Sequence, residues 1–359
     1  QATDLNTDHF VAAWNYVESL GQRQSMLVIR HGWIVGEWDH VGTGPVNSST
    51  KSLTGLALAK LFELSDAGLL PKKIGYDDFA YHYLPAAWSD SDPRKKRIKV
   101  RDLPTMCSGL EAMDRGIRDL NAVLALPVVH PPETIDQYSS ASVNLEGMII
   151  ENASGQKLSD FFRQYISEPI AAESMRLPRD ACGAAGYAFM QTRDFARFGY
   201  LMLRNGTWNN GGGVHQLVRP DLIARCKQWP TFLMNVTDGP GNNTQWWTTV
   251  DPPSHFLHTW HGWWVNWSPD WPTSMRPLWP FIPKDAFWMS GSGKDICVVI
   301  PSLDLIIAHQ TARADGLEQA GTAPGAARDP SRQGAAACQR TPGRPAGRCD
   351  HGASGRLTG

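Results

Sequence analysis

The chain has 359 residues, enough for one large catalytic domain or two smaller domains; 42% of them are hydrophobic and 19% are charged. This composition is typical of a soluble globular protein, and a formal net charge of -1 gives no electrostatic argument for nucleic acid or an anionic membrane as a partner. No stretch of 18 apolar residues without charges occurs, so we expect no membrane span.

Hydrophobic periodicity predicts several helices and two hairpins. Residues 8–20 have the pattern of an amphipathic helix, and the apolar runs 25–30 and 34–38 meet across a glycine turn as a hairpin. Another helical pattern covers residues 51–67 and is followed by a polar, helix-poor region to about residue 100. Three further helical patterns and a second hairpin follow, at residues 142–153, 157–167, 188–204 and 295–309.

Two segments have an unusual composition. Residues 229–288 hold ten of the fifteen tryptophans, interleaved with prolines and histidines. From about residue 312 onward, Ala, Gly, Arg and Pro dominate and large apolar residues are scarce. Because such a tail cannot bury enough surface to offset the entropy of ordering, we expect residues 312–359 to be disordered.

Some features bear on localisation. The sequence begins at Gln1, so we expect that a leader was removed or the chain was trimmed, and the sequence does not separate these alternatives. Its six cysteines include no C-x-x-C pair and indicate neither a zinc site nor a small disulfide scaffold. Five N-x-[ST] sequons lie outside residues 47–51 and suit a secreted chain, so we expect a secreted or periplasmic protein, with the cytoplasm as the alternative; they begin at Asn152, Asn205, Asn235, Asn242 and Asn266.

The most informative motif is a serine three positions ahead of a lysine, Ser48 and Lys51, where a helical pattern begins. On a helix, these positions lie on one face, about 5–6 Å apart. A serine hydroxyl becomes nucleophilic when a nearby base takes its proton, and a desolvated lysine can be that base. The simpler alternative is a serine that caps the helix, with a solvated lysine one turn later.

Two later motifs carry groups suited to the same chemistry. Tyr138 directly precedes an apolar helical pattern, and a tyrosine there can point its hydroxyl into a cleft. The run Ser290-Gly291-Ser292-Gly293 directly precedes an apolar strand, and small residues at a strand edge let a substrate approach backbone N–H groups closely. Taken singly, each motif also has an ordinary explanation, a half-buried tyrosine and a glycine turn.

Together and in this order, the motifs resemble the serine β-lactamase and penicillin-binding-protein superfamily. Within it, the chain is most similar to class C-like (family VIII) carboxylesterases and to 6-aminohexanoate-dimer (nylon-oligomer) hydrolases. The resemblance runs from about residue 8 to residue 311, and its ordered matches are the opening hairpin, the Ser48–Lys51 motif, 103–110, Tyr138-Ser139-Ser140, 192–199, 245–247 and 299–305.

This resemblance implies an α+β fold of the β-lactamase/transpeptidase type over residues 1–311. Its antiparallel sheet would be built from both chain ends and flanked by helices, with a mostly helical region inserted at about 70–180. The resemblance also implies a Ser-Lys-Tyr mechanism through an acyl-enzyme. Ser48 would be the nucleophile, Lys51 and Tyr138 would share general base and acid work, and the backbone N–H groups of Ser48 and Ser292 would form the oxyanion hole.

Departures from the family pattern bear on the substrate. The second motif is often Tyr-x-Asn, but here it reads Tyr138-Ser139-Ser140; the third is Lys-Thr-Gly in β-lactamases, but here Ser290-Gly291-Ser292. We therefore expect a carboxylesterase acting on short-chain or aromatic esters, with an amide hydrolase of the nylon-oligomer type as the alternative. A β-lactamase or D-alanyl peptidase ranks behind both, and a catalytically silent binding protein is the alternative from another class.

Histidines and tryptophans near residue 260 suggest two further hypotheses. His255, His258 and His261 recur every three residues, but no acidic partner lies at ligand spacing, so we expect no metal and no cofactor. The tryptophans suit an aromatic wall beside a small ester or amide substrate, with core packing as the alternative. The candidate substrate-binding residues are Trp246, Trp263, Trp264 and Gly291.

Overall fold

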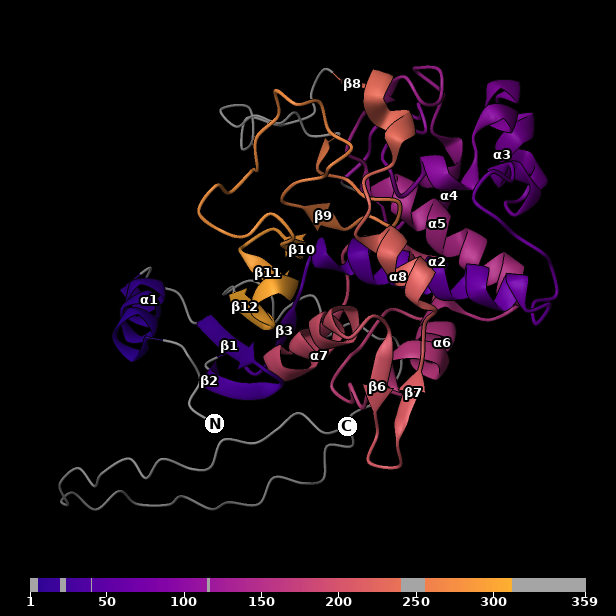
Figure 1. Ribbon diagram of the computed structural model, residues 1–359. Helices are drawn as coiled ribbons and strands as arrows, with labels where there is room; N and C mark the ends of the chain where they lie inside the picture. Colours follow the sequence, from indigo (N-terminus) through magenta and orange to yellow (C-terminus); the bar gives the residue numbers. More distant parts are fainter. Residues whose placement is uncertain (1–5, 20–23, 40, 115–116, 240–255, 312–359) are drawn as a thin grey trace, which may run out of the picture.

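The computed structural model describes residues 6–19, 24–39, 41–114, 117–239 and 256–311. Within these ranges the chain forms one six-stranded antiparallel sheet with helices against it (Figure 1). In spatial order the strands are β2 (Trp33–Asp39), β1 (Gln24–Arg30), β12 (Leu305–Thr311), β11 (Asp295–Ile300), β10 (Phe287–Gly291) and β9 (Trp264–Val265).

The sheet is built from both ends of the described chain. Strand β1 pairs with β12 in a register that sets Gln24 opposite Thr311 and Arg30 opposite Leu305. The two predicted hairpins, β1–β2 and β11–β12, therefore lie side by side in one sheet, which confirms the expected α+β architecture.

Strand β1 is buried along its whole length because helices cover both faces of the sheet. Its Leu27 and Ile29 belong to the main core, whereas Met26 and Val28 face a smaller cluster under α1 (Thr7–Ser19). Alternate side chains of a strand point to opposite faces, so one apolar run fills both clusters.

The main core contains residues from Leu27 to Ala308, and most of the helices pack into it. Helices α2 and α5 run beside each other in Figure 1 on the side of the sheet away from α1. The helices after α1 are α2 (Ser49–Asp66), α3 (Ala86–Asp90), α4 (Leu120–Ala125), α5 (Ser140–Ser154), α6 (Leu158–Phe162), α7 (Thr192–Leu203) and α8 (Pro220–Cys226).

Outside the main sheet, three pairs of short strands in the described residues connect loop segments to each other. They are β3 (Thr43–Pro45) with β5 (Phe189–Gln191), β4 (Ile135–Asp136) with β8 (Thr237–Asp238), and β6 (Thr207–Asn209) with β7 (Val214–Gln216). The helix predicted over residues 188–204 begins only at Thr192, because residues 189–191 pair with β3 as a strand. Here a long-range strand pairing prevails over the helical pattern.

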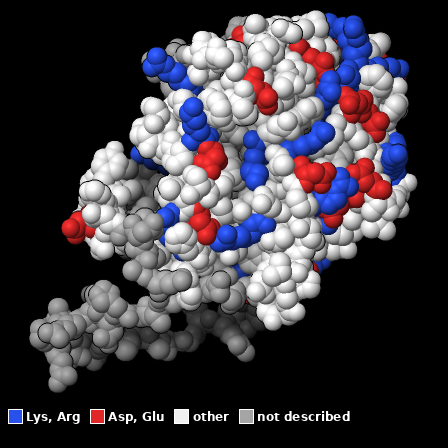
Figure 2. Space-filling view, in the orientation of Figure 1, with Lys and Arg blue, Asp and Glu red and all other residues white. Residues whose placement is uncertain are grey.

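Charged side chains of both signs are intermixed on the face shown in Figure 2. In the described ranges, no helix is long and apolar enough to cross a membrane. The expected tail, residues 312–359, lies outside the described residues.

Candidate active site

Ser48 stands at the N-cap of α2, but its side chain does not cap the helix. Instead its Oγ lies 3.0 Å from Nζ of Lys51, and Lys51 is only 4% exposed. The simpler alternative, a capping serine with a solvated lysine, therefore does not describe this pair. A half-buried hydroxyl and a buried amine are in direct contact, as the spacing of the two residues predicted.

Two further contacts fix the Lys51 amine. Its Nζ donates to the carbonyl of Ala185 at 2.8 Å and lies 4.9 Å from the centre of the Tyr138 ring. Tyr138 is positioned by the short parallel pair β4–β8 just before it and by the start of α5 just after it. The structure thus brings together the three side chains that the sequence nominated: Ser48, Lys51 and Tyr138.

Asn144 on α5 connects the elements around Lys51. Its Oδ1 accepts from the backbone N–H of Ala185 at 3.1 Å, and its Nδ2 donates to the carbonyl of Ile117 at 2.8 Å. Asn144 is fully buried. One side chain therefore links α5, the loop at Ile117 and Ala185, the residue whose carbonyl accepts from Lys51.

The end of β10 approaches the turn that carries Ser48. A Cβ at Gly291 would lie 2.3 Å from the carbonyl oxygen of Val46, so only glycine fits there. Asn47, with φ of 48°, donates from Nδ2 to the carbonyl of Ser292 at 2.8 Å and to Asp295 at 2.5 Å. These contacts hold the segment at Ser292 beside the start of α2.

The family model for beta-lactamase matches residues 24–330. The chain belongs to the beta-lactamase family. A search of curated proteins found no match.

Solved structures share the beta-lactamase fold at low sequence identity. A provisionally assigned beta-lactamase from Bacteroides dorei has a TM-score of 0.65 at 14% identity, covering 86% of this chain and 92% of that one. A provisionally assigned 6-aminohexanoate-dimer hydrolase from Bacillus anthracis has a TM-score of 0.61 at 16% identity, with coverages of 85% and 78%. A family VIII carboxylesterase has a TM-score of 0.58 at 14% identity, with coverages of 86% and 91%.

Three positioning residues of this beta-lactamase-family site were not nominated from the sequence: Asn47, Asn144 and Asp295. Asp295 joins the end of β12 to the first turn of α2, because it accepts from Thr311 N at 2.9 Å and its carbonyl accepts from Ser49 Oγ at 2.7 Å. The one local signal was an asparagine directly before the serine, since asparagine tolerates a left-handed backbone. For the other two residues, the sequence carries no comparable signal.

The tryptophans occupy positions that favour core packing over a substrate wall. Trp263 is fully buried and its ring lies 5.7 Å from that of Phe287, while Trp264 is 9% exposed and packs edge-on against His258. A side chain without accessible surface cannot line a cleft, so the structure corrects the expectation for Trp263 and argues against it for Trp264. Trp246 lies outside the described residues.

The described histidines of the 255–261 series contact different partners. His258 Nδ1 lies 3.3 Å from Oδ1 of Asp136, a carboxylate too far away in the sequence to be predicted from spacing. His261 Nε2 lies 2.6 Å from the hydroxyl of Tyr76. Within the described ranges, no cluster of three metal-ligating side chains occurs, and His255 lies outside those ranges.

His261 also makes the stability of the protein depend on pH. Burial lowers the pKa of its imidazole from 6.5 to about 3, and its carbonyl packs so closely on Gly55 of α2 that a Cβ there would clash. Between pH 6.5 and about pH 3, the unfolded chain binds a proton that the folded chain does not. This histidine therefore removes about 1.4 kcal/mol of unfolding free energy per pH unit as pH falls through this window.

We expect His261→Gln to abolish that dependence. Chemical denaturation at several values between pH 6.5 and pH 4.5 should show the difference in unfolding free energy between wild type and variant changing by about 1.4 kcal/mol per pH unit. The same substitution at His9, an exposed position on α1, controls for the loss of one histidine. Parallel curves for wild type and His261→Gln would contradict the prediction.

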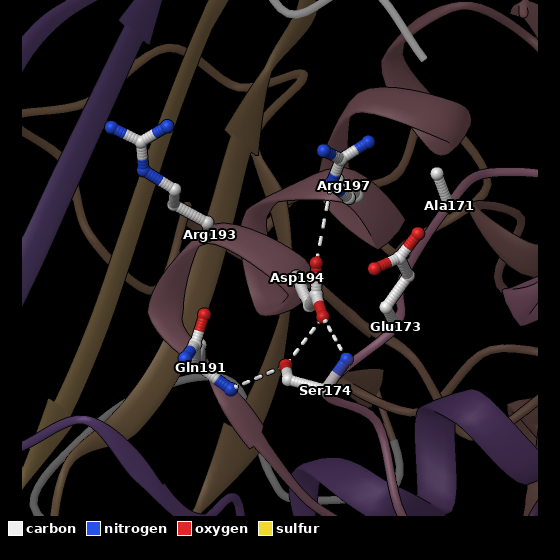
Figure 3. Close-up of a pocket in the computed structure, with 7 residues that line it drawn as sticks. All are labelled: Ala171, Glu173, Ser174, Gln191, Arg193, Asp194 and Arg197. Carbon is white, nitrogen blue, oxygen red and sulfur yellow. Dashed lines mark hydrogen bonds and ion pairs between the residues drawn. The ribbon is translucent and has the colours of Figure 1, made fainter.

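Two cavities in the described structure lie away from Ser48. The larger, of about 400 Å³, opens at the start of α7 (Figure 3). There Asp194 accepts from the backbone and hydroxyl of Ser174 and forms an ion pair with the Arg197 guanidinium at 3.2 Å. The second, of about 230 Å³, lies between α2 and α8 beside Tyr76 and Arg225. Neither is lined by Ser48, Lys51 or Tyr138.

Proposed function

We propose that this protein is a carboxylesterase that forms an acyl-enzyme on Ser48. The observation that supports this most directly is the 3.0 Å contact between Ser48 Oγ and the buried amine of Lys51, made in place of a helix cap. The chain belongs to the beta-lactamase family, whose members are typically serine hydrolases, and this agrees with a serine nucleophile at Ser48.

In the proposed acylation, Ser48 Oγ attacks the ester carbonyl carbon and its proton passes to Lys51. A neutral amine can keep its bond to the carbonyl of Ala185 and direct its lone pair toward the serine hydroxyl. The carbonyl π electrons move onto oxygen, and they return when the bond to the leaving alkoxide breaks. Tyr138, beside the amine, would pass a proton to that alkoxide.

The charge that develops on the carbonyl oxygen needs donors. The backbone N–H of Ser48, at the start of α2, and that of Ser292, after β10, are the proposed pair. Asn47, the residue directly before Ser48, supports this assignment. Its side chain donates a hydrogen bond to the carbonyl of Ser292, which holds Ser292 near Ser48. Water would then attack the acyl-enzyme and regenerate the serine by the reverse proton transfers.

Features near Tyr138 favour esters over amides with polar side chains. At the position where many relatives carry an amide, Ser140 is buried and its backbone N–H donates to Asp114 at 2.8 Å. Ser139 is also buried and its hydroxyl accepts from Met113 N. In place of the fixed amide that would bind a substrate side chain, this chain therefore has buried serines, and the Ser139 hydroxyl is bonded within the protein. Esters also have a better leaving group than amides.

A substrate panel tests the proposal. With 4-nitrophenyl butyrate, 4-nitrobutyranilide and nitrocefin, we expect kcat/KM for the ester to exceed the other two by about tenfold or more. A missing substrate hydrogen bond of about 1.4 kcal/mol in the transition state corresponds to one decade. A preference for the anilide would support the amide-hydrolase alternative, and efficient nitrocefin turnover without esterase activity would refute the carboxylesterase assignment.

A further inference from the structure

Arg118 lies on a loop that is connected to the proposed catalytic lysine by hydrogen bonds through Asn144. The carbonyl of the preceding residue, Ile117, accepts from Asn144, whose Oδ1 accepts from Ala185 N; the Ala185 carbonyl in turn accepts from Lys51. Three hydrogen bonds therefore separate this loop from Lys51 Nζ. Ile117 is buried, whereas Arg118 is exposed at the surface of the same loop.

The Arg118 guanidinium lies over the ring of Tyr187, 4.2 Å from its centre. Tyr187 is half-buried and packs against the main core. The residue before it, Gly186, faces the backbone of Asn47, and the carbonyl of the residue after it, Ala188, accepts from Val46 N. The ring is thus a fixed platform beside the turn that carries Ser48.

The charge of Arg118 is not neutralised by the described part of the protein. No carboxylate among the described residues lies within ion-pair distance of its guanidinium. The neighbouring Asp119 uses its Oδ1 to cap α4. By contrast, Arg94 and Arg163, also exposed, pair with Asp92 and Glu168 at 2.8 and 2.9 Å.

Stacking occupies the face of a guanidinium and leaves the N–H donors on its edge available. Those donors match the two oxygens of a carboxylate, and a guanidinium that is already ordered loses less entropy when it binds one. We propose that Arg118, held on Tyr187, binds a carboxylate carried by the ester or amide substrate. This inference rests on the proposed function of Ser48 and assigns to its substrate an anionic group that would contact Arg118.

Matched pairs of esters test the subsite. Mono-4-nitrophenyl adipate carries a carboxylate on its acyl chain, and 4-nitrophenyl hexanoate is its neutral counterpart. 4-Acetoxybenzoate carries the carboxylate on its leaving group, and methyl 4-acetoxybenzoate is the neutral match. In at least one pair, we expect Arg118→Gln to lower the ratio of anionic to neutral kcat/KM by about tenfold to a hundredfold, mainly through KM.

Two controls separate this subsite from general charge effects and from catalysis. Arg163→Gln removes an exposed arginine elsewhere and should leave both ratios as in wild type, whereas Arg118→Lys should recover only part of the preference. Unchanged ratios in Arg118→Gln, with the neutral esters still hydrolysed, would overturn the subsite and leave the esterase proposal intact.

If the neutral esters are not hydrolysed at all, the proposed function fails and binding decides the subsite. Calorimetry with 4-acetoxybenzoate on Ser48→Ala would then be compared with the same titration on Ser48→Ala/Arg118→Gln. A tenfold or greater loss of affinity in the double variant supports the subsite, and equal affinities refute it.

Discussion

Ser48→Ala should abolish both turnover and covalent labelling by a serine-directed fluorophosphonate. The nucleophile is the atom to which the acyl group bonds, so no other contact in the site can replace it. Removal of such a group in acyl-transfer enzymes costs on the order of 10⁴–10⁶-fold in kcat. Intact-mass spectrometry of the labelled protein and ester hydrolysis measured in parallel are the two readouts.

Neighbouring serines provide the controls for this experiment. Ser49 donates to the carbonyl of Asp295 and Ser52 to that of Gly262, so both hydroxyls bond the start of α2 to other segments of the protein. Ser52→Ala should therefore still be labelled at Ser48. A label that persists in Ser48→Ala, or that maps to Ser49 or Ser52, would show that the nucleophile is assigned to the wrong residue.

The parts of the site that follow from local geometry could be predicted from the sequence. Ser48 and Lys51 are three residues apart on one helix, so their contact depends on helical geometry alone. The two hairpins were also predictable, because apolar runs separated by a turn pair with each other. That β1 and β12 lie side by side was expected only through the resemblance to the family.

The supporting contacts could not be predicted, because they join residues far apart in sequence. Asn144 meets Ala185, and Asp136 meets His258, across separations that no periodic pattern encodes. For Trp263, composition led to a wrong prediction. The tryptophan-rich segment suggested that this residue lines a cleft, but its side chain is buried in the core. A single exposed arginine such as Arg118 has no sequence signal until its stacking on Tyr187 is seen.

Lys51→Met should lose about 10²–10⁴-fold in the rate of acylation while the protein stays folded. Positioned proton transfer typically contributes a factor of this size, and methionine replaces the apolar stem of the lysine but not its amine. Two hydrogen bonds are lost, those of Nζ with Ser48 Oγ and with the carbonyl of Ala185, together with the contact of the amine with the Tyr138 ring. The unpaired carbonyl costs about 1–3 kcal/mol of stability. Stopped-flow measurement of the acylation burst reports the chemical effect separately.

Lys60→Met is the matched control because Lys60 lies on the same helix and is also buried, at 9% exposure. Its Nζ donates to the carbonyl of Leu217 at 2.6 Å and to Glu63 at 2.7 Å, so the substitution also leaves a carbonyl without its donor. Lys60→Met should lose comparable stability in chemical denaturation but keep its acylation rate. If both variants lose acylation equally, the effect is structural, and if Lys51→Met acylates at the wild-type rate, the base that activates Ser48 is another group.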